Sequence, residues 1–109
     1  MGTPLKPHQV TFSEGFLRIL QERQRQIDQE GFDLEHDKEH DAGELARAAA
    51  CYAASAGGVS EVLNKWVGGE LWPWAPEWDK RKEHSKIRQL EIAGALIVAE
   101  LDRLLSEDS

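Results

Sequence analysis

Residues 31–52 read GFDLEHDKEHDAGELARAAACY, and they join a dense group of ionisable side chains to a run of alanines. The ionisable residues are His36, Asp37, Glu39, His40, Asp41 and Glu44. Alanines suit close packing of two helices, because small side chains let the backbones approach each other. The segment Asp41-Ala-Gly-Glu44 has the form of a capping box. We therefore expect a helix with Asp41 as its N-cap that runs to about Ala54.

A helix is also predicted before this segment. Thr11-Phe-Ser-Glu14 is a second capping box, and Gly31 is a typical stop signal, so the helix should begin at Thr11 and end near Gly31. Its apolar residues at helical spacing are Phe16, Ile19, Leu20 and Ile27. Its other face carries Glu22, Arg23, Arg25, Gln26 and Asp28. We expect this polar face to be solvated.

The last predicted helix is the most apolar part of the chain. It should begin between Asp79 and Ser85 and end near Leu105. Its apolar residues at intervals of three and four are Ile87, Leu90, Gly94, Ile97, Leu101 and Leu104. Further apolar residues widen this surface nearly all round, which is typical of a central helix. We expect the alanine-rich helix to pack on this helix, the one that contains Gly94.

These elements predict an all-α fold, a single-domain bundle of about four helices. The fourth is a short helix at Ser60–Trp66, closed by Gly68 and Gly69. Residues 71–78, LWPWAPEW, should form a Trp/Pro-rich loop before the long central C-terminal helix, since proline interrupts regular structure. The 109 residues then divide into a flexible N-terminal arm at 1–10, a helical domain at 11–105 and a short tail at 106–109.

Charge and hydropathy exclude some classes of partner. The formal net charge of -7 opposes the wrapping of long duplex nucleic acid. The longest apolar run, residues 92–99, is far shorter than the roughly 20 residues of a membrane span. We therefore expect no membrane partner and a cytoplasmic location. The lone Cys51 lies among alanines and is expected to be a buried thiol.

The His- and Asp-rich segment offers ligands for a divalent ion. His36 and His40 have the i, i+4 spacing of two zinc ligands on a helix, but the capping box places both in a loop, where zinc would need a third ligand. Mg²⁺ is the alternative ion, and its candidate ligands are Asp37, Asp41 and Glu44, with Glu91 or Glu100 from the last helix. The simpler interpretation is that these residues cap the helix and hydrogen-bond the loop to the bundle.

Tryptophans and basic residues follow each other closely in the third quarter of the chain. Trp72, Trp74 and Trp78 lie within seven residues, and their indoles could stack on a nucleobase. The basic residues directly behind them are Lys80, Arg81, Lys82, His84, Lys86 and Arg88. Cations at a helix start can bind phosphate. The alternative is a Trp-lined loop that covers the open end of the bundle, followed by a solvated basic turn.

Several short motifs carry a resemblance that covers residues 20–103. They are RQI at 25–27, EGF at 30–32, HD at 36–37 with His40, GELA at 43–46, AAA at 48–50, YA at 52–53, WPW at 72–74, RQL at 88–90, AGALI at 93–97 and AE at 99–100. Together they resemble a family of small proteins of tailed phages and prophages that has no settled activity. The resemblance implies a phage protein in a bacterial cytoplasm.

A weaker resemblance is to the all-α, MazG-like nucleotide pyrophosphohydrolases. It implies magnesium held by acidic residues and cleavage of nucleoside triphosphates to monophosphate and pyrophosphate. The motif of that family pairs two Glu residues three apart on one helix with a Glu and an Asp three apart on the next. Here Arg47 stands three residues after Glu44, and no clean second pair follows. This departure favours a binding protein over an enzyme.

Our leading hypothesis is a small phage-type protein that binds a nucleotide-like ligand and could sequester a host defence nucleotide signal. The residues expected to stack on the base are Trp72, Trp74 and Trp78; those for phosphate are Arg81, Lys82 and Arg88; those for ribose or a metal are His36, Asp37, His40 and Glu44. The alternatives are a MazG-like pyrophosphohydrolase and an acidic module that inhibits a host protein. We expect a homodimer, because four short helices cannot cover so apolar a last helix.

Overall fold

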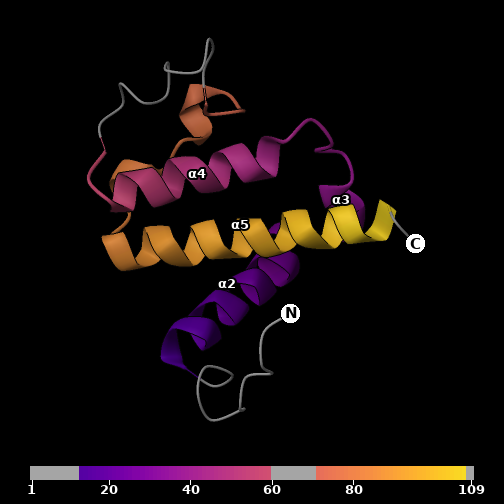
Figure 1. Cartoon of the computed structure of the whole chain (residues 1–109), viewed down its shortest axis with the longest axis horizontal. Helices are drawn as coiled ribbons and strands as arrows, with labels where there is room; N and C mark the ends of the chain where they lie inside the picture. Colours follow the sequence, from indigo (N-terminus) through magenta and orange to yellow (C-terminus); the bar gives the residue numbers. More distant parts are fainter. Residues whose placement is uncertain (1–12, 60–70, 108–109) are drawn as a thin grey trace, which may run out of the picture.

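The computed structural model describes residues 13–59 and 71–107, which form an all-α bundle (Figure 1). Its long helices are α2 (Glu14–Glu30), α4 (Glu44–Ala56) and α5 (Lys86–Glu107). A single helical turn, α3 (Leu34–Asp37), joins α2 to α4, and two 3₁₀ turns, η2 (Pro76–Trp78) and η3 (Arg81–Glu83), precede α5. The described residues contain no strand, so the predicted all-α class is confirmed. Among these helices, none combines the length and the apolar composition needed to cross a bilayer.

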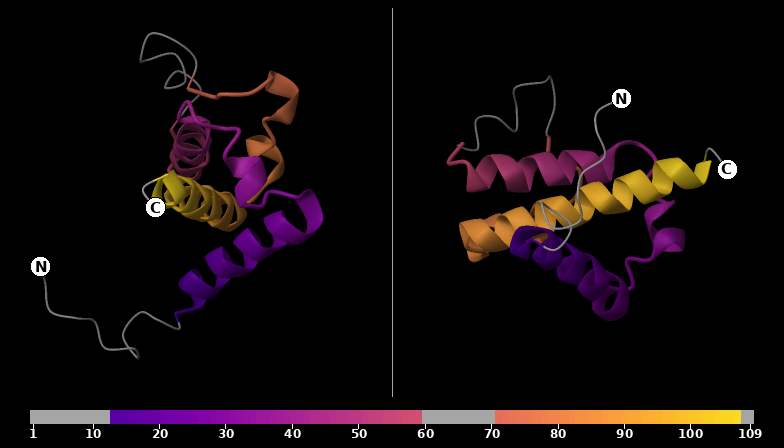
Figure 2. Two further views of the ribbon diagram at one scale, coloured as in Figure 1. Left: turned by 90° about the vertical axis from the view of Figure 1, so that its right-hand side faces the viewer. Right: turned by 60° about the horizontal axis from the view of Figure 1, so that its bottom comes forward.

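Helix α5 is the central element of the described chain. Helix α4 lies along it and runs in the opposite direction, while α2 crosses it on another side (Figures 1 and 2). The contact between α4 and α5 is made by small and branched apolar residues, all of them buried: Ala48, Ala49, Ile92, Ala93, Leu96 and Ala99. The alanine-rich helix therefore packs on the last helix, as its composition predicts. Burial of this surface, at about 25 cal/mol per Å², is the main stabilising contribution at this interface.

Gly94 lies at the crossing of α5 with α2. A Cβ atom at this position would be 2.6 Å from Ile19 Cδ1 of α2. Helix α5, which contains Gly94, is the predicted partner of α4. Gly94 itself, however, accommodates α2 and not α4. Its role is to let Ile19 approach the backbone of α5, which even a methyl group would obstruct.

The predicted N-caps of both early helices are wrong. Helix α4 begins after Gly43, whose φ of 82° lies in the left-handed region that favours glycine, and no side chain caps the helix. The Glu44 carboxylate instead accepts a hydrogen bond from the Ala42 amide at 2.7 Å, so Asp41 is not the N-cap. Helix α2 begins at Glu14, and its N-cap is Ser13, which accepts from the Phe16 amide. Both helices therefore start two to three residues later than predicted.

The solvated polar face predicted for α2 is also wrong. Glu22, Arg23 and Gln26 are buried, whereas Phe16 and Leu20 are about half exposed. The reason is that the buried polar side chains have charged or amide partners, described below, which replace lost hydration. The end of α2 therefore docks through polar contacts.

One apolar stripe of α5 remains at the surface. Leu90, Ile97, Leu101 and Leu104 are between 44% and 52% exposed, although their spacing predicts a buried face. The buried face of α5 is instead rotated toward Ile92, Ala93, Leu96 and Ala99. The short helix expected at Ser60–Trp66, the glycines after it, Thr11 and the N-terminal arm at 1–10 lie outside the described residues.

We expect Gly94→Ala to lower the free energy of unfolding by about 1 kcal/mol. Overpacking against Ile19 costs about 1–3 kcal/mol, which exceeds the gain of roughly 1 kcal/mol from replacing a helical glycine with alanine. In an Ile19→Ala background the clash is absent, so Gly94→Ala should then stabilise the protein. Urea denaturation of the four proteins measures both effects. Destabilisation in both backgrounds would show that Ile19 is not the constraint.

Candidate functional site

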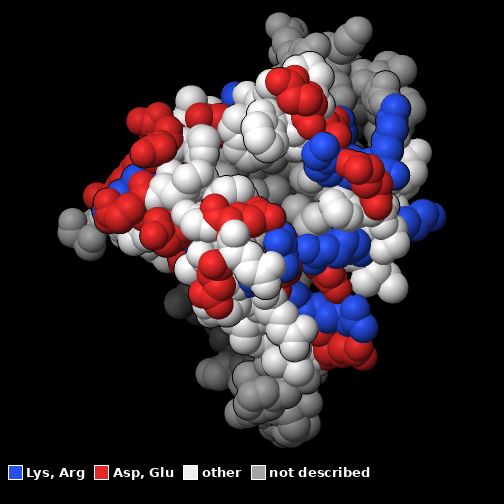
Figure 3. Space-filling model, turned by 180° about the vertical axis from the view of Figure 1, so that it is seen from behind, with Lys and Arg blue, Asp and Glu red and all other residues white. Residues whose placement is uncertain are grey.

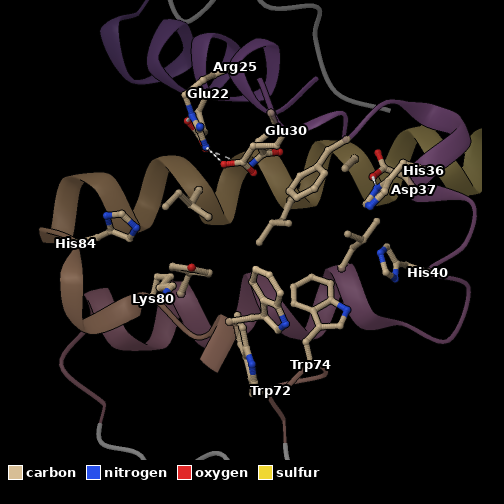
Figure 4. Close-up of a pocket in the computed structure, with 18 of the residues that line it drawn as sticks. Glu22, Arg25, Glu30, His36, Asp37, His40, Trp72, Trp74, Lys80 and His84 are labelled. Carbon is tan, nitrogen blue, oxygen red and sulfur yellow. Dashed lines mark hydrogen bonds and ion pairs between the residues drawn. The ribbon is translucent and has the colours of Figure 1, made fainter. Parts of the chain in front are cut away.

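A cavity of about 860 Å³ opens between α2, α3, α4, the segment 71–85 and one face of α5. Its volume lies within the 300–1,000 Å³ typical of small-molecule sites. Figure 3 shows this face of the molecule as hollowed, with many Lys and Arg side chains on one side of the hollow and many Asp and Glu side chains on the other. Figure 4 shows the side chains that converge on the cavity from elements far apart in the sequence.

One wall of the cavity is a continuous row of aromatic and imidazole rings, which we call the aromatic row. In order of contact it consists of Phe32, His36, His40, Trp74, Trp72 and Tyr52. Neighbouring ring centroids are 4.7 to 6.0 Å apart, within the usual range for favourable ring pairs. All six residues line the cavity. The row thus provides an aromatic and imidazole wall to the cavity.

Short-range contacts hold the tryptophan part of this row. Trp72 Nε1 donates to the Ala75 carbonyl at 3.2 Å, which closes the turn around the prolines. The Arg81 guanidinium lies 5.6 Å from the centroid of the Trp72 ring, a cation–π distance. Arg81 also pairs with Asp79, and these hydrogen bonds hold the pKa of the Asp79 carboxyl below its usual value. Burial raises the pKa of Tyr52 to about 12, so its phenol stays neutral.

The facing wall is built around a buried carboxylate on α2. The Glu22 side chain is 1% exposed, and it accepts from Arg25 Nε at 2.8 Å and from Arg88 of α5 at 2.6 Å. Burial alone would raise the pKa of Glu22, but the hydrogen bonds from Arg25 and Arg88 bring it below its usual value. Arg25 also pairs with Glu30 at 2.9 Å. In Figure 4, Glu22, Arg25 and Glu30 lie across the cavity from Trp72 and Trp74.

Gln26 adds an amide to this charged wall. Its Nε2 donates to Glu22 Oε2 at 3.2 Å, which fixes the orientation of the amide, because a reversed amide would bring two oxygens together. The Gln26 side chain lines the cavity. Its Oε1 atom is buried and has no hydrogen-bond partner among residues 13–59 and 71–107. A buried acceptor of this kind costs roughly 1–3 kcal/mol unless a donor reaches it.

A buried ion pair fixes α3 to α2 at the histidine end of the cavity. Asp37, whose side chain is 1% exposed, accepts from Arg23 at 2.8 Å. The same guanidinium donates to the Phe32 carbonyl at 2.7 Å. The other Asp37 oxygen lies 3.3 Å from His36 Nδ1. This arrangement holds the His36 ring in its place between Phe32 and His40.

His40, like His36, lies beside a carboxylate. Its Nδ1 lies 3.4 Å from a carboxylate oxygen of Glu44 at the start of α4. Burial tends to raise the pKa of Glu44, but hydrogen bonds from the backbone amides of Glu44 and Ala42 and from His40 bring it below its usual value. His36 was expected in a loop, yet it lies in the helical turn α3, which Asp33 caps.

The cavity gathers most of the residues expected to bind a ligand. Those that line it are His36, Asp37, His40, Trp72, Trp74, Trp78 and Arg88. Three expected residues, Glu44, Arg81 and Lys82, are not part of its lining. From the basic cluster, Lys80 and His84 line the cavity instead of Arg81 and Lys82.

The contribution of α2 to the site was not predicted from the sequence. The missed residues are Glu22, Arg25, Gln26 and Glu30, together with Tyr52 of α4. A signal for the α2 residues was present, because Ile27 is the only apolar residue between positions 21 and 30. A helix end with so few apolar residues can pack only through polar contacts.

The structure does not bring the candidate magnesium ligands together. Among the described residues, no group of three or more His, Cys, Asp or Glu side chains is placed to hold a metal ion. Asp37 pairs with Arg23, whereas Glu44 lies beside His40. Glu91 pairs with Arg18 and Arg88. Each carboxylate just named therefore already has a positively charged or imidazole partner.

The remaining titratable groups of interest lie away from the cavity. Cys51 is fully buried, as expected, and burial raises the pKa of its thiol. The ion pairs around Glu100 are in part buried, because Arg103 is 4% exposed and pairs with Glu100 and Glu107. Arg103 and its two carboxylate partners contribute to packing near the C-terminal end of α5.

We expect Asp37→Ala to lower the free energy of unfolding by about 3–5 kcal/mol, because it leaves the buried Arg23 guanidinium without its carboxylate. Glu35→Ala on the same turn is the matched control. Glu35 pairs with Lys38 at the surface, and such pairs contribute at most about 1 kcal/mol. Chemical denaturation measures both changes. Equal effects of the two substitutions would contradict the structural role of the Arg23–Asp37 pair.

Acid should destabilise the fold partly through Glu22. Its folded-state pKa lies below the unfolded value, so the unfolded chain takes up the proton first as the pH falls. The stability from this group is therefore present above about pH 4.3 and is lost as the pH falls through the folded pKa. In Glu22→Gln this component of the pH dependence should disappear. Urea unfolding of both proteins at a series of pH values between about 6 and 2 gives the slope of the unfolding free energy against pH. Equal slopes for Glu22→Gln and the unmodified protein would contradict the assignment.

The chain matches no family profile, no curated protein and no solved structure in our comparisons. The resemblances to the phage family and to the pyrophosphohydrolases therefore stay predictions from the sequence.

Proposed function

We propose that this protein binds a nucleotide-like ligand in the cavity. The observation that carries the proposal is the pairing of the aromatic row on one wall with guanidinium and ammonium groups on the others. Indole faces stack on any nucleobase, and such contacts contribute about 1–3 kcal/mol per base. The volume of about 860 Å³ is sufficient for a ligand of nucleotide size.

The phosphate end of the ligand is assigned to the region of Lys80, His84 and Arg88. Lys80 is about half exposed, and its nearest carboxylate is Glu83 at 3.7 Å, a loose surface pair. Its ammonium group can therefore turn to a phosphate at little cost. Arg88 is held by Glu22 and Glu91, so it is pre-oriented at the start of α5. In Figure 4, Lys80 and His84 lie at the opposite end of the cavity from His36 and His40.

Gln26 supports a polar ligand over a purely apolar one. Its buried, unpartnered Oε1 atom lies in a residue that lines the cavity wall. If the Gln26 side chain turned this oxygen toward the cavity, an N–H or O–H group of a ligand would remove a cost of roughly 1–3 kcal/mol. A hydrocarbon ligand would leave that cost in place.

The pairing of the cavity carboxylates favours binding over metal-dependent hydrolysis. Glu22, Glu30 and Asp37 each have an arginine partner within 3 Å. In this role the carboxylates orient the arginines and are not directed at a shared ion. Binding without turnover is what a protein that sequesters a nucleotide signal would require, and the phage-type motifs suggest that setting.

The expected homodimer is also a proposal. Its support is the apolar stripe of α5 together with Phe16, Leu17 and Leu20 of α2, all exposed in the single chain. Large exposed apolar patches are typical of protein–protein contacts. A second copy is the partner that a symmetric dimer would place there.

The binding proposal is tested first by a thermal-shift screen against nucleotides and cyclic nucleotides, since a ligand bound only by the folded state raises Tm. We expect Lys80→Ala to weaken the affinity for the best hit about tenfold or more, because a hydrogen bond to a charged group contributes about 1.5–3 kcal/mol. Trp74→Ala should abolish the shift. Calorimetric titration gives the affinities.

Lys86→Ala is the matched control for Lys80→Ala, because Lys86 is exposed, begins α5 and does not line the cavity. Equal loss of affinity in the two variants would show that net charge, and not the cavity, attracts the ligand. Analysis of the nucleotide released after denaturation separates binding from catalysis. Full recovery of the intact nucleotide is the expected result, and recovery of its monophosphate and pyrophosphate would favour the hydrolase.

A further inference from the structure

We propose that His36 and His40 form a pair of hydrogen-bond acceptors at one end of the cavity, each presenting its Nε2 atom to a hydroxyl or N–H group of the ligand. This inference rests on the proposed ligand-binding function and specifies which part of the ligand the histidine end receives. It follows from the contact that each ring makes at its other nitrogen.

Both rings meet a carboxylate at Nδ1. His36 Nδ1 lies 3.3 Å from Asp37 Oδ1, and His40 Nδ1 lies 3.4 Å from Glu44 Oε2. An ionised carboxylate can only accept a hydrogen bond, so each Nδ1 carries the hydrogen. A neutral ring then has its lone pair at Nε2. Within the two described segments, neither Nε2 atom has a hydrogen-bond partner of its own.

The two carboxylates are themselves held in place. The second oxygen of Asp37 accepts from Arg23 at 2.8 Å, in an ion pair that is almost completely buried. The second oxygen of Glu44 accepts from the Ala42 amide at 2.7 Å. Neither carboxylate can rotate without breaking these bonds. The tautomer and the direction of each imidazole are thus set before a ligand arrives, as in sites where a carboxylate orients a functional histidine.

The two imidazoles are neighbours and remain partly accessible. Their centroids are 5.1 Å apart in an edge-to-face arrangement, and their side chains are 34% and 21% exposed. His36 stacks on Phe32 at 4.7 Å, and His40 meets the edge or face of Trp74 at 5.5 Å. Two adjacent acceptors beside an indole suit a group with two adjacent donors. A ribose diol has this chemistry, and at this end of the cavity it would lie beside a base stacked on Trp74, the neighbour of His40.

The tautomers can be measured without any ligand, by long-range ¹H–¹⁵N correlation of the histidine side chains in the full chain at about pH 8.5, where an ordinary histidine is neutral. We expect His36 and His40 to carry their hydrogen at Nδ1. In Glu44→Ala, His40 should change to a mixture of both tautomers while His36 stays as it is. An Nε2–H form of either ring in the unmodified protein, or an unchanged His40 in Glu44→Ala, would overturn the acceptor pair.

The same spectra test the donor group with ADP and 2′,3′-dideoxy-ADP as probes. We expect ADP to shift the Nε2 resonances of both rings, and the analogue without hydroxyls to shift them several-fold less. Shifts of the indole signals with no change at either Nε2 would contradict recognition at the histidine end. An ADP titration that changes no resonance counts against the proposed function for this nucleotide, and the tautomers alone then decide the acceptor pair.

Discussion

The buried carboxylate of Glu22 is the interaction on which the described arrangement of α2 depends. It accepts from Arg25 on its own helix and from Arg88 on α5, and it also orients Gln26. Removing a carboxylate from water costs several kcal/mol, and only well-placed donors offset that cost. Once the donors are in place, the position of α2 relative to the start of α5 is fixed. The charged wall of the cavity is a direct result of how these two helices are joined.

The fold class and the helix that occupies the centre could be predicted, because both depend on local patterns that persist over many residues. The small face of the alanine-rich helix and the apolar length of the last helix determine the α4–α5 pair directly. Helix starts were less predictable, since a left-handed glycine at position 43 replaced the expected Asp41 cap. A glycine that begins a helix and an aspartate that caps it look equally suitable in the sequence. The left-handed backbone conformation of Gly43 determines where the helix begins.

The site was predicted only in part, because some of its residues are conspicuous in the sequence and others are not. His36, His40 and the tryptophans are unusual for their chemistry, so composition alone draws attention to them. Glu22 and Arg25 look like any solvated helix face, and what makes them functional candidates is the position of Arg88, more than sixty residues away. The scarcity of apolar residues at positions 21–30 indicates that this end of α2 packs through polar contacts, but no local pattern identifies Arg88 as the partner. Lys80 precedes the 3₁₀ turn η3 and Lys82 lies within it, and of the two only Lys80 lines the cavity.

The interface of α5 with α4 and its interface with α2 also differ in their response to temperature. Opening the apolar contact with α4 would raise the heat capacity, whereas exposing the polar contacts that hold the end of α2 would lower it. Cooling therefore weakens the first interface and has no such effect on the second. The cavity includes side chains from both, Leu96 and Ala99 of the apolar contact and Glu22 and Arg88 of the polar one. Its shape is thus maintained by two kinds of contact that respond differently to cooling.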